Sequence, residues 1–253
     1  MSDALNQSPR LFVEADLRND VKLTLEQGQA HYLQNVMRLQ PGGAIRLFNG
    51  RDGEWQAEAA EISKKSFVVN LVVRIKPQKI ETDLWLCCAP IKKAHFEYML
   101  EKATELGAAV IQPVLTARTQ VREVNVERAR ATCVEAAEQS ERMSLPEIRK
   151  PLTLKELAAT WPADRALIIC AEWGDAVPVH DAFAKNHAQL SKAGIATGPE
   201  GGFAGEELEM LRDVKNVHFV RLGPRILRAD TAAIAALSCW QAMCGDWHQT
   251  PRG

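Results

Sequence analysis

Two glycine-rich stretches in the last third of the chain decide the fold: Thr197-Gly198-Pro199-Glu200-Gly201-Gly202-Phe203 and Leu222-Gly223-Pro224-Arg225-Ile226-Leu227-Arg228. Each follows a short apolar run, at residues 193–197 and 217–222. Short apolar runs that end at Gly-Pro are typical of buried strands. A helical pattern follows each stretch, so the sequence predicts two strand–loop–helix units side by side in an α/β fold with a parallel sheet. In such sheets ligands bind at the carboxyl ends of the strands.

The glycines of these loops leave room for a ligand. Gly198, Gly201, Gly202 and Gly223 can adopt positive φ and carry no side chain, so the backbone can approach a bound molecule closely. Backbone N–H and C=O groups could then bind a nucleoside. The alternative is a pair of tight turns without a ligand, and it is less favoured because two such loops occur, each after a strand.

The two stretches, the second continued by Thr231-Ala232, resemble the cofactor loops of the SPOUT class of methyltransferases. Within that class the resemblance is to the RsmE family, which methylates N3 of a uridine in 16S ribosomal RNA, and it covers about residues 10–240. It implies a C-terminal domain with a deep trefoil knot, an exception to the rule that chains do not thread their own loops. It also implies S-adenosyl-L-methionine as cofactor, 16S ribosomal RNA or the assembled small ribosomal subunit as partner, and a homodimer.

The resemblance further implies which residues enclose the adenosine. These residues belong to the two loops and the start of the last helix: Thr197, Gly198, Gly201, Gly202, Leu222, Gly223, Ile226, Leu227, Arg228, Thr231 and Ala232. Arg225 and Arg228 have two interpretations, which are binding of RNA phosphate and an ion pair with an acid such as Asp230. The family usually has Glu where this chain has Asp230, and the shorter side chain puts in doubt any role that needs the longer reach.

Methylation at N3 sets two chemical requirements. The nucleophile and the methyl carbon must be held in line, and N3 must lose its proton to a base. A carboxylate placed against the sulfonium would stabilise the ground state more than the transition state. We therefore expect Glu172 and Glu200 to face the N3 proton, a ribose hydroxyl or the methionine ammonium, and we assign the base role to Glu200. The competing interpretation is that Glu200 anchors its own loop through backbone N–H groups.

The first 76 residues are predicted to form a separate small β domain. Alternating strands, one hairpin turn at residues 49–53 and one helix at residues 27–39 indicate a compact barrel. By resemblance this is a PUA-like RNA-binding domain, and residues 77–253 form the methyltransferase domain. The strands are expected at residues 11–13, 21–25, 44–48, 54–62 and 67–75.

Basic residues in both domains are expected to bind the RNA. Arg10 and Arg38 match the family pattern in the first domain. Arg142 ends a stretch, residues 135–142, that resembles a family signature facing the substrate, although an ordinary charged helix face explains the same spacing. The complete set of predicted RNA contacts is Arg10, Arg38, Lys92, Lys93, Arg118 and Arg142.

The overall composition narrows the function classes. The chain has 31 Lys and Arg against 32 Asp and Glu, so any nucleic-acid site must be a local patch. The six cysteines form no C-x-x-C pair and the six histidines show no metal-ligand spacing, so we expect reduced thiols and no metal site. No apolar stretch has transmembrane length and the start is not a signal peptide, so we expect a cytoplasmic protein without a membrane partner.

Two other functions compete with the methyltransferase interpretation. A catalytically silent RNA-binding protein of the same fold is disfavoured because both loops keep their glycines. A Rossmann or P-loop enzyme is disfavoured because neither G-x-G-x-x-G nor G-K-[ST] follows a strand. The bound cofactor separates the three.

Overall fold

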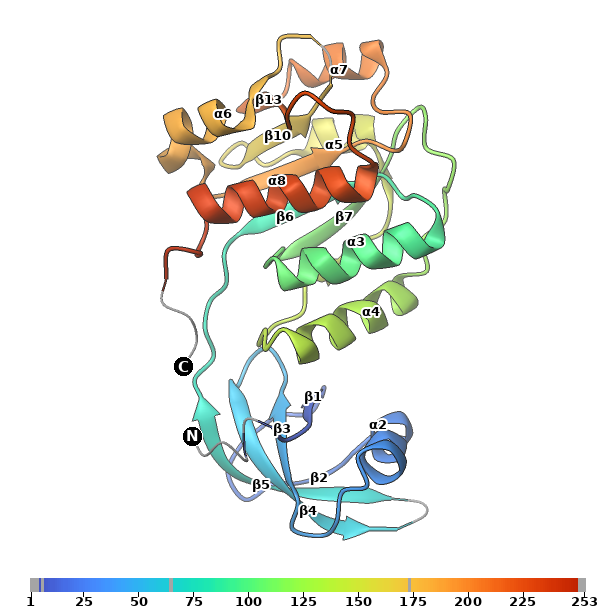
Figure 1. Cartoon of the computed structure of the whole chain (residues 1–253), viewed down its shortest axis with the longest axis vertical. Coiled ribbons are helices and arrows are strands. Elements are labelled where there is room, and N and C mark those ends of the chain that lie inside the picture. Colours follow the sequence, from blue (N-terminus) through green and yellow to red (C-terminus); the bar gives the residue numbers. More distant parts are fainter. Residues whose placement is uncertain (1–4, 6, 64–65, 173, 250–253) are drawn as a thin grey trace. The chain divides into compact units, whose positions relative to one another are not determined.

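The computed structural model describes residue 5 and residues 7–63, 66–172 and 174–249. The chain forms two compact units, and Figure 1 labels most of their helices and strands. The first contains Met1–Ile80 and Ala137–Leu145, and the second contains Glu81–Ala136 and Pro146–Gly253. The sequence assigns residues 137–145 to the second domain, whereas the structure places them in the first unit.

The first unit is built on a five-stranded sheet in the order β1-β3-β4-β5-β2. β1 runs parallel to β3, and the other neighbours are antiparallel, as the hairpin prediction requires for β3 and β4. The end strands β1 and β2 do not pair with each other among the described residues, so the predicted barrel is not closed by a continuous ladder. The strands are β1 (Arg10–Phe12), β2 (Lys22–Thr24), β3 (Ala44–Phe48), β4 (Glu54–Ile62) and β5 (Phe67–Lys76).

The predicted helix at residues 27–39 is α-helical only at its start. α2 (Gln27–His31) continues as a single stretch of π-helix, Tyr32–Val36. Arg38 follows with a φ of 51°, in the left-handed region that a continuing helix does not allow. The helix therefore ends before Arg38, whose side chain lies exposed on the first unit.

A buried charge network organises the first unit. Glu54 is fully buried, and its carboxylate accepts hydrogen bonds from Arg10 Nε at 3.1 Å and Arg46 Nη1 at 3.3 Å. Arg46 also donates to Glu141 at 2.7 Å, and Lys76 Nζ donates to the same carboxylate at 3.1 Å. The hydrogen bond from Arg46 outweighs partial burial, and with Lys76 it lowers the pKa of Glu141 to about 2. Hydrogen bonds and ion pairs thereby connect β3 and β5 to the segment of residues 137–145.

Arg10 joins this network to the backbone of the same segment. Its Nη1 donates to the carbonyl of Ala137 at 2.7 Å and its Nη2 to the carbonyl of Arg142 at 2.9 Å. Arg10 and Arg142 are only 6% and 4% exposed. The sequence predicts that both guanidinium groups bind RNA, but their burial inside the first unit does not support an RNA contact through either.

The second unit contains a sheet in the order β11-β13-β10-β12-β6-β7-β8, with every neighbouring pair parallel. β10 lies between β12 and β13, so the two strands that precede the glycine-rich loops are not adjacent, contrary to the sequence prediction. The strands are β6 (Leu84–Cys88), β7 (Val110–Leu115), β8 (Glu147–Ile148), β9 (Leu152–Thr153, paired with β7), β10 (Ala166–Cys170), β11 (Val177–Pro178), β12 (Ala193–Thr197) and β13 (Val217–Arg221).

Helices cover both faces of this sheet. Successive residues of a strand point to opposite faces, and here the residues on both faces are apolar and buried. Leu86 and Ile168 pack toward one face and Cys87 and Ile169 toward the other. Helices α3 (Lys93–Glu105), α4 (Val126–Gln139), α6 (Val179–Asn186) and α8 (Ala229–Met243) contribute to the first core, and α5 (Leu154–Thr160) and α7 (Gly205–Leu211) to the second; a 3₁₀ turn spans His187–Leu190. The predicted α/β architecture is confirmed.

The last helix determines where the functional loops meet. β13 pairs with β10, yet α8 packs on β12 and β6 (Figure 1). Residues 222–228 must therefore cross the carboxyl end of the sheet to connect β13 with α8. This crossing brings the second glycine-rich loop toward the first. The trefoil knot itself stays a prediction.

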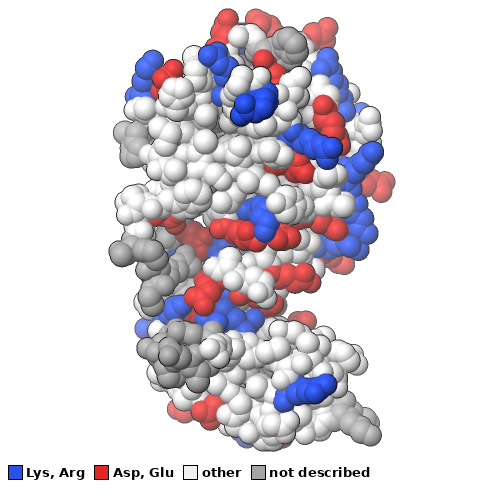
Figure 2. Space-filling view, viewed as in Figure 1, with Lys and Arg blue, Asp and Glu red and all other residues white. Residues whose placement is uncertain are grey.

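No described helix is long and apolar enough to cross a membrane. Within residues 5, 7–63, 66–172 and 174–249, no group of three or more His, Cys, Asp or Glu side chains could hold a metal ion. Acidic and basic side chains are interspersed over the face of the molecule shown in Figure 2.

Candidate active site

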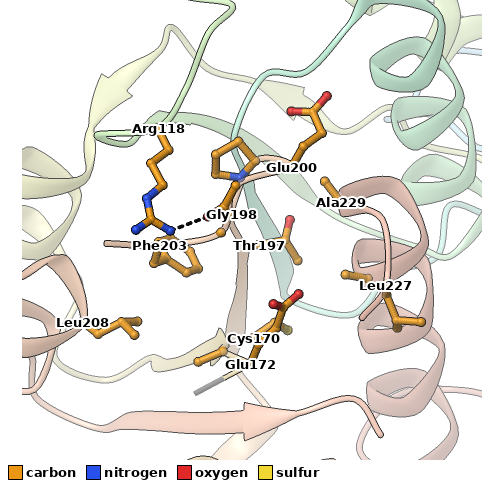
Figure 3. A pocket seen from close by; sticks show the side chains of 15 residues that line it. Arg118, Cys170, Glu172, Thr197, Gly198, Glu200, Phe203, Leu208, Leu227 and Ala229 are labelled. Atoms are coloured by element: carbon orange, nitrogen blue, oxygen red, sulfur yellow. Dashed lines mark hydrogen bonds between the residues drawn. The ribbon is translucent and has the colours of Figure 1, made fainter. Parts of the chain in front are cut away.

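Two adjoining pockets lie at the carboxyl ends of β10, β12 and β13 and share the loop after β10, Leu227 and Ala232 as lining; together we call them the loop cleft. The two glycine-rich loops lie on its two sides, and the loop after β10 lies between them. Figure 3 shows the part nearest β12, with Phe203 and Leu208 on one side and Leu227 on the other. The residues lining the cleft are Arg118, Cys170–Glu172, Thr197–Phe203, Leu208, Val220–Leu227, Ala229 and Ala232.

The first loop contains a hydrogen-bonding group with no partner. Thr197 is 3% exposed, and its Oγ1 is buried without a hydrogen-bond partner among the described residues. A buried hydroxyl without a partner costs free energy, so a ligand that bonds to it would be stabilised there. The hydroxyl lies at the cleft, between the labelled Glu200 and Leu227 (Figure 3).

The glycines serve this cleft in two different ways. Gly202 and Gly223 have φ of 64° and 111°, and a Cβ on either would meet no atom within 4 Å. Gly198 does not need positive φ, but a Cβ there would lie 3.1 Å from the carbonyl carbon of Gly202. The sequence allows positive φ at Gly198, Gly201 and Gly202, and in the structure only Gly202 of the first loop adopts it. Gly198 is required for close packing of the loop on itself.

Arg118 braces the first loop from the loop after β7. Its Nη1 donates to the carbonyl of Gly201 at 2.6 Å (Figure 3), and the neighbouring Ala117 N–H donates to Glu207 at 2.7 Å. The other oxygen of Glu207 accepts from Ala204 N–H, at the start of α7. The predicted RNA contact Arg118 therefore holds a cleft loop through a backbone carbonyl.

Replacing Arg118 by Ala is expected to weaken the binding of a cleft ligand about 5- to 10-fold, the effect of one lost hydrogen bond of about 1 kcal/mol. Calorimetric titration with S-adenosylhomocysteine measures this. Arg122→Ala, an exposed arginine four residues further on, is the matched control. Loss of RNA affinity with unchanged titration would instead assign Arg118 to the RNA.

The loop after β10 gives the cleft its third side. Burial raises the pKa of the Cys170 thiol to about 12, so this side chain stays neutral. Glu172 lies next to it at the end of the cleft opposite Glu200 (Figure 3). Both carboxylates are exposed, and no hydrogen bond or ion pair joins either to another described residue. The cleft thus carries two separate, unengaged carboxylates.

A second cavity adjoins the cleft at Glu200 and Ala229, and we call it the polar pocket after the charged and polar residues among those that line it. It lies between the start of α3, the first glycine-rich loop and the start of α8. His95 Nδ1 and Asp230 Oδ2 are 2.8 Å apart in this pocket. The pocket is lined by Ile91, Lys92, His95, Glu200, Arg228, Ala229 and Asp230.

Asp230 is ionised in this arrangement. Burial acts to raise its pKa, but hydrogen bonds from His95 and from the N–H and hydroxyl of Thr231 outweigh burial and lower it. The carboxylate side chain is 10% exposed, whereas the imidazole of His95 is 44% exposed. The sequence offers Asp230 as a partner for Arg225 or Arg228, but the structure pairs it with His95.

The loop cleft contains all of the residues predicted for the cofactor except Arg228 and Thr231. Arg228 lines the polar pocket, while Thr231 is exposed beside it and lines neither cavity. Lys92 also lines the polar pocket, and Lys93 lies exposed next to it on α3. His95 is absent from the sequence prediction. Its signal was available, because a helix that follows a parallel strand starts at the edge where ligands bind.

The family of the chain follows from comparison with known proteins. The RNA methyltransferase domain family matches residues 78–241, and the RNA methyltransferase PUA domain family matches residues 25–72. The ribosomal RNA small subunit methyltransferase E of Rickettsia conorii is 34% identical over 90% of this chain and 93% of its own length. The chain belongs to the ribosomal RNA small subunit methyltransferase E family. This confirms the resemblance to the RsmE family and the PUA-like character of the first unit.

Other members of the methyltransferase E family support the same placement. The protein of this name from a Synechocystis species is 34% identical over 90% of this chain and 76% of its own length. A solved methyltransferase E from Neisseria gonorrhoeae, bound to S-adenosyl methionine, superposes with a TM-score of 0.86 at 25% identity, covering 95% of this chain and 100% of that chain. A Legionella pneumophila methyltransferase solved with the cofactor SAM gives 0.81 at 28% identity, covering 93% and 98%. A methyltransferase that uses S-adenosylmethionine is therefore confirmed, and the silent RNA-binding protein is not supported.

Proposed function

We propose that this protein methylates N3 of a uridine in 16S ribosomal RNA with S-adenosyl-L-methionine bound in the loop cleft. The observation that carries the proposal is the buried, partnerless hydroxyl of Thr197 between two glycine-rich loops. The names of the relatives supply the substrate class. When bound, the cofactor supplies an electrophilic methyl group on a sulfonium.

The residues of the loop cleft fit this cofactor. Phe203, Leu208, Leu222, Ile226 and Leu227 provide apolar walls suited to a purine and a thioether. Ile226 is 79% exposed, and a ligand against the loop would cover it. Backbone groups near Gly202 and Gly223 can approach the ligand because no side chain intervenes. The predicted residues from both loops that line the cleft are proposed to hold the cofactor: Thr197, Gly198, Gly201, Gly202, Leu222, Gly223, Ile226, Leu227 and Ala232.

The carboxylates of the cleft act away from the sulfur in this proposal. Glu172 accepts hydrogen bonds from a ribose hydroxyl or the methionine ammonium at its end of the cleft. Glu200 stands at the opening between the loop cleft and the polar pocket, where the target base would enter. The sequence predicts that Glu200 is the base that accepts the N3 proton. Its carboxylate has no hydrogen-bond or ion-pair partner among the described residues.

The RNA is proposed to enter through the polar pocket as an unpaired or extruded nucleotide, because pairing hides N3 on the Watson–Crick edge. Lys92 and Arg228 provide cations at this pocket for the flanking phosphates, and Lys93 lies beside them. Arg38 is the exposed predicted contact on the PUA-like unit. A cytoplasmic homodimer acting on naked 16S RNA or on the small subunit completes the proposal.

The test is methyl transfer from labelled S-adenosylmethionine to unmodified 16S RNA and to small subunits that lack the modification, with nucleoside mass spectrometry of the product. We expect 3-methyluridine at a single site. Label in another nucleoside would contradict the choice of N3, and saturable cofactor binding without label in either substrate would contradict the RNA assignment.

A further inference from the structure

We propose that His95 is the base that removes the N3 proton, with Asp230 as its positioning residue; this rests on the proposed function. The pocket that holds the pair opens onto the loop cleft at Glu200 and Ala229, so its groups face the point where a target base would meet the methyl group. General bases act within hydrogen-bond reach of the proton they accept.

The hydrogen bond to Asp230 determines which imidazole nitrogen is free. An ionised carboxylate only accepts hydrogen bonds, so Nδ1 of His95, 2.8 Å from Asp230 Oδ2, must carry the proton. In the neutral ring Nε2 then has the lone pair. No hydrogen bond or ion pair joins Nε2 to another described residue. The buried carboxylate lies behind the ring and the half-exposed ring faces the pocket, which is the arrangement of an oriented base.

The chemistry favours imidazole over a carboxylate at this position. A base works best when its protonation equilibrium lies near the working pH, and imidazole is the side chain that ordinarily titrates between pH 5 and 8. An ordinary carboxylate is a much weaker base. Glu200 shares the pocket, so it is the competing acceptor that the experiment must separate from His95.

The electrostatic surroundings of His95 are mixed. Lys92 at the start of α3 and Arg228 before α8 place cations at the pocket, and Glu200 and Asp230 place carboxylates there. Asp230 makes the direct contact, and it stabilises the imidazolium that forms when the proton arrives.

The step balances as follows. The N3–H bond breaks and its proton goes to Nε2 of His95, while the electron pair of N3 forms the bond to the methyl carbon. The carbon–sulfur pair stays on sulfur, leaving neutral S-adenosylhomocysteine, and the imidazolium returns its proton to water.

The experiment compares single-turnover methyl transfer across pH in the full-length wild type and in His95→Asn, His95→Gln and Glu200→Gln. Asn keeps a donor near the position of Nδ1 but cannot accept the proton at Nε2. We expect both His95 variants to lose about 100-fold in rate, the lower range for general base catalysis, and to lose the rise in rate with pH. Binding of S-adenosylhomocysteine is expected to change less than twofold. Glu200→Gln is expected to keep the pH-dependent rise.

The matched control is His180→Gln, which removes another histidine of the second unit that lies 3.2 Å from an aspartate, Asp181, but has a 74% exposed side chain on α6. It should retain the wild-type profile. Asp230→Asn provides the readout for positioning. Because the carboxylate favours the protonated ring, the rise in rate should move to lower pH and the maximum should fall. Nitrogen-15 NMR of histidine should show the Nδ1–H tautomer of His95 in the wild type.

Three results would overturn the inference: His95→Asn within threefold of the wild-type rate, a pH-dependent rise that survives in it but disappears in Glu200→Gln, or an Nε2–H tautomer of His95. These failures differ from failure of the proposed function. In that case the wild type itself forms no 3-methyluridine, and the role of His95 falls with it.

Discussion

Replacing Gly198 by Val is expected to lower the affinity for S-adenosylhomocysteine about 100-fold, the upper range for overpacking a tight contact. A Cβ at residue 198 would lie 3.1 and 3.2 Å from backbone atoms of Gly202 and 3.3 Å from the Phe203 nitrogen. Backbone cannot rotate away as a side chain can, so the first loop must open. Calorimetric titration of the folded protein measures the loss.

Substitutions at two neighbouring glycines provide comparisons for the loss of affinity expected at Gly198. A Cβ at Gly201 meets only the Arg118 side chain, at 3.3 Å, so Gly201→Ala is expected to cost less than Gly198→Ala. Gly205→Val is the matched control, because a Cβ at Gly205 meets no atom within 4 Å and its φ is not positive. Unchanged affinity in the folded Gly198→Val protein would contradict a cofactor site that includes the first loop.

Replacing Glu54 by Ala is expected to lower the free energy of unfolding of the first unit by about 3–5 kcal/mol, as when one partner of a buried ion pair is removed. Arg10 and Arg46 would both lose the carboxylate that neutralises them inside the unit, and only Arg46 keeps Glu141. Burial already lowers the pKa of Arg10, although Glu54 opposes this, so the guanidinium depends on its partner.

Hydrogen exchange read by mass spectrometry can follow the two units separately. Protection should fall in β3, β4 and β5 of Glu54→Ala and stay unchanged in β10 and β12. Glu58→Ala, an exposed glutamate on the same strand, should leave β4 protected. A fall of under 1 kcal/mol in Glu54→Ala would mean that the network adds little net stability.

Local patterns predicted most elements, because alternation and helical spacing are short-range properties of a sequence. The bounds of β3, β4 and β12 agree with the predicted ranges. A charged helix face is one interpretation of residues 135–142, but α4 ends at Gln139 and Glu141 has φ of 59°. That turn depends on Glu141 meeting Arg46 and Lys76, which are distant in sequence, so no local pattern could reveal it.

The candidate site also has features that local sequence predicts and features that depend on contacts between distant residues. The two loops were predicted because glycine spacing is visible in the sequence, and the structure brings them to one cleft. The pairing of His95 with Asp230 joins positions 135 residues apart and depends on how α8 returns to the sheet. The place of β10 between β12 and β13 is likewise a property of strand order, which element patterns leave open.

The membership of residues 137–145 in the first unit has a consequence for synthesis on the ribosome. The partners of Arg10 at Ala137 and Arg142 are translated long after the five strands of the first unit, because residues 81–136 of the second unit come between them. A nascent chain that has emerged only to residue 80 therefore carries the Glu54 network without its closing segment. Vectorial folding, one domain after another from the amino terminus, is the usual order for chains of several domains. Here the first unit can reach its native state only after much of the second has been made.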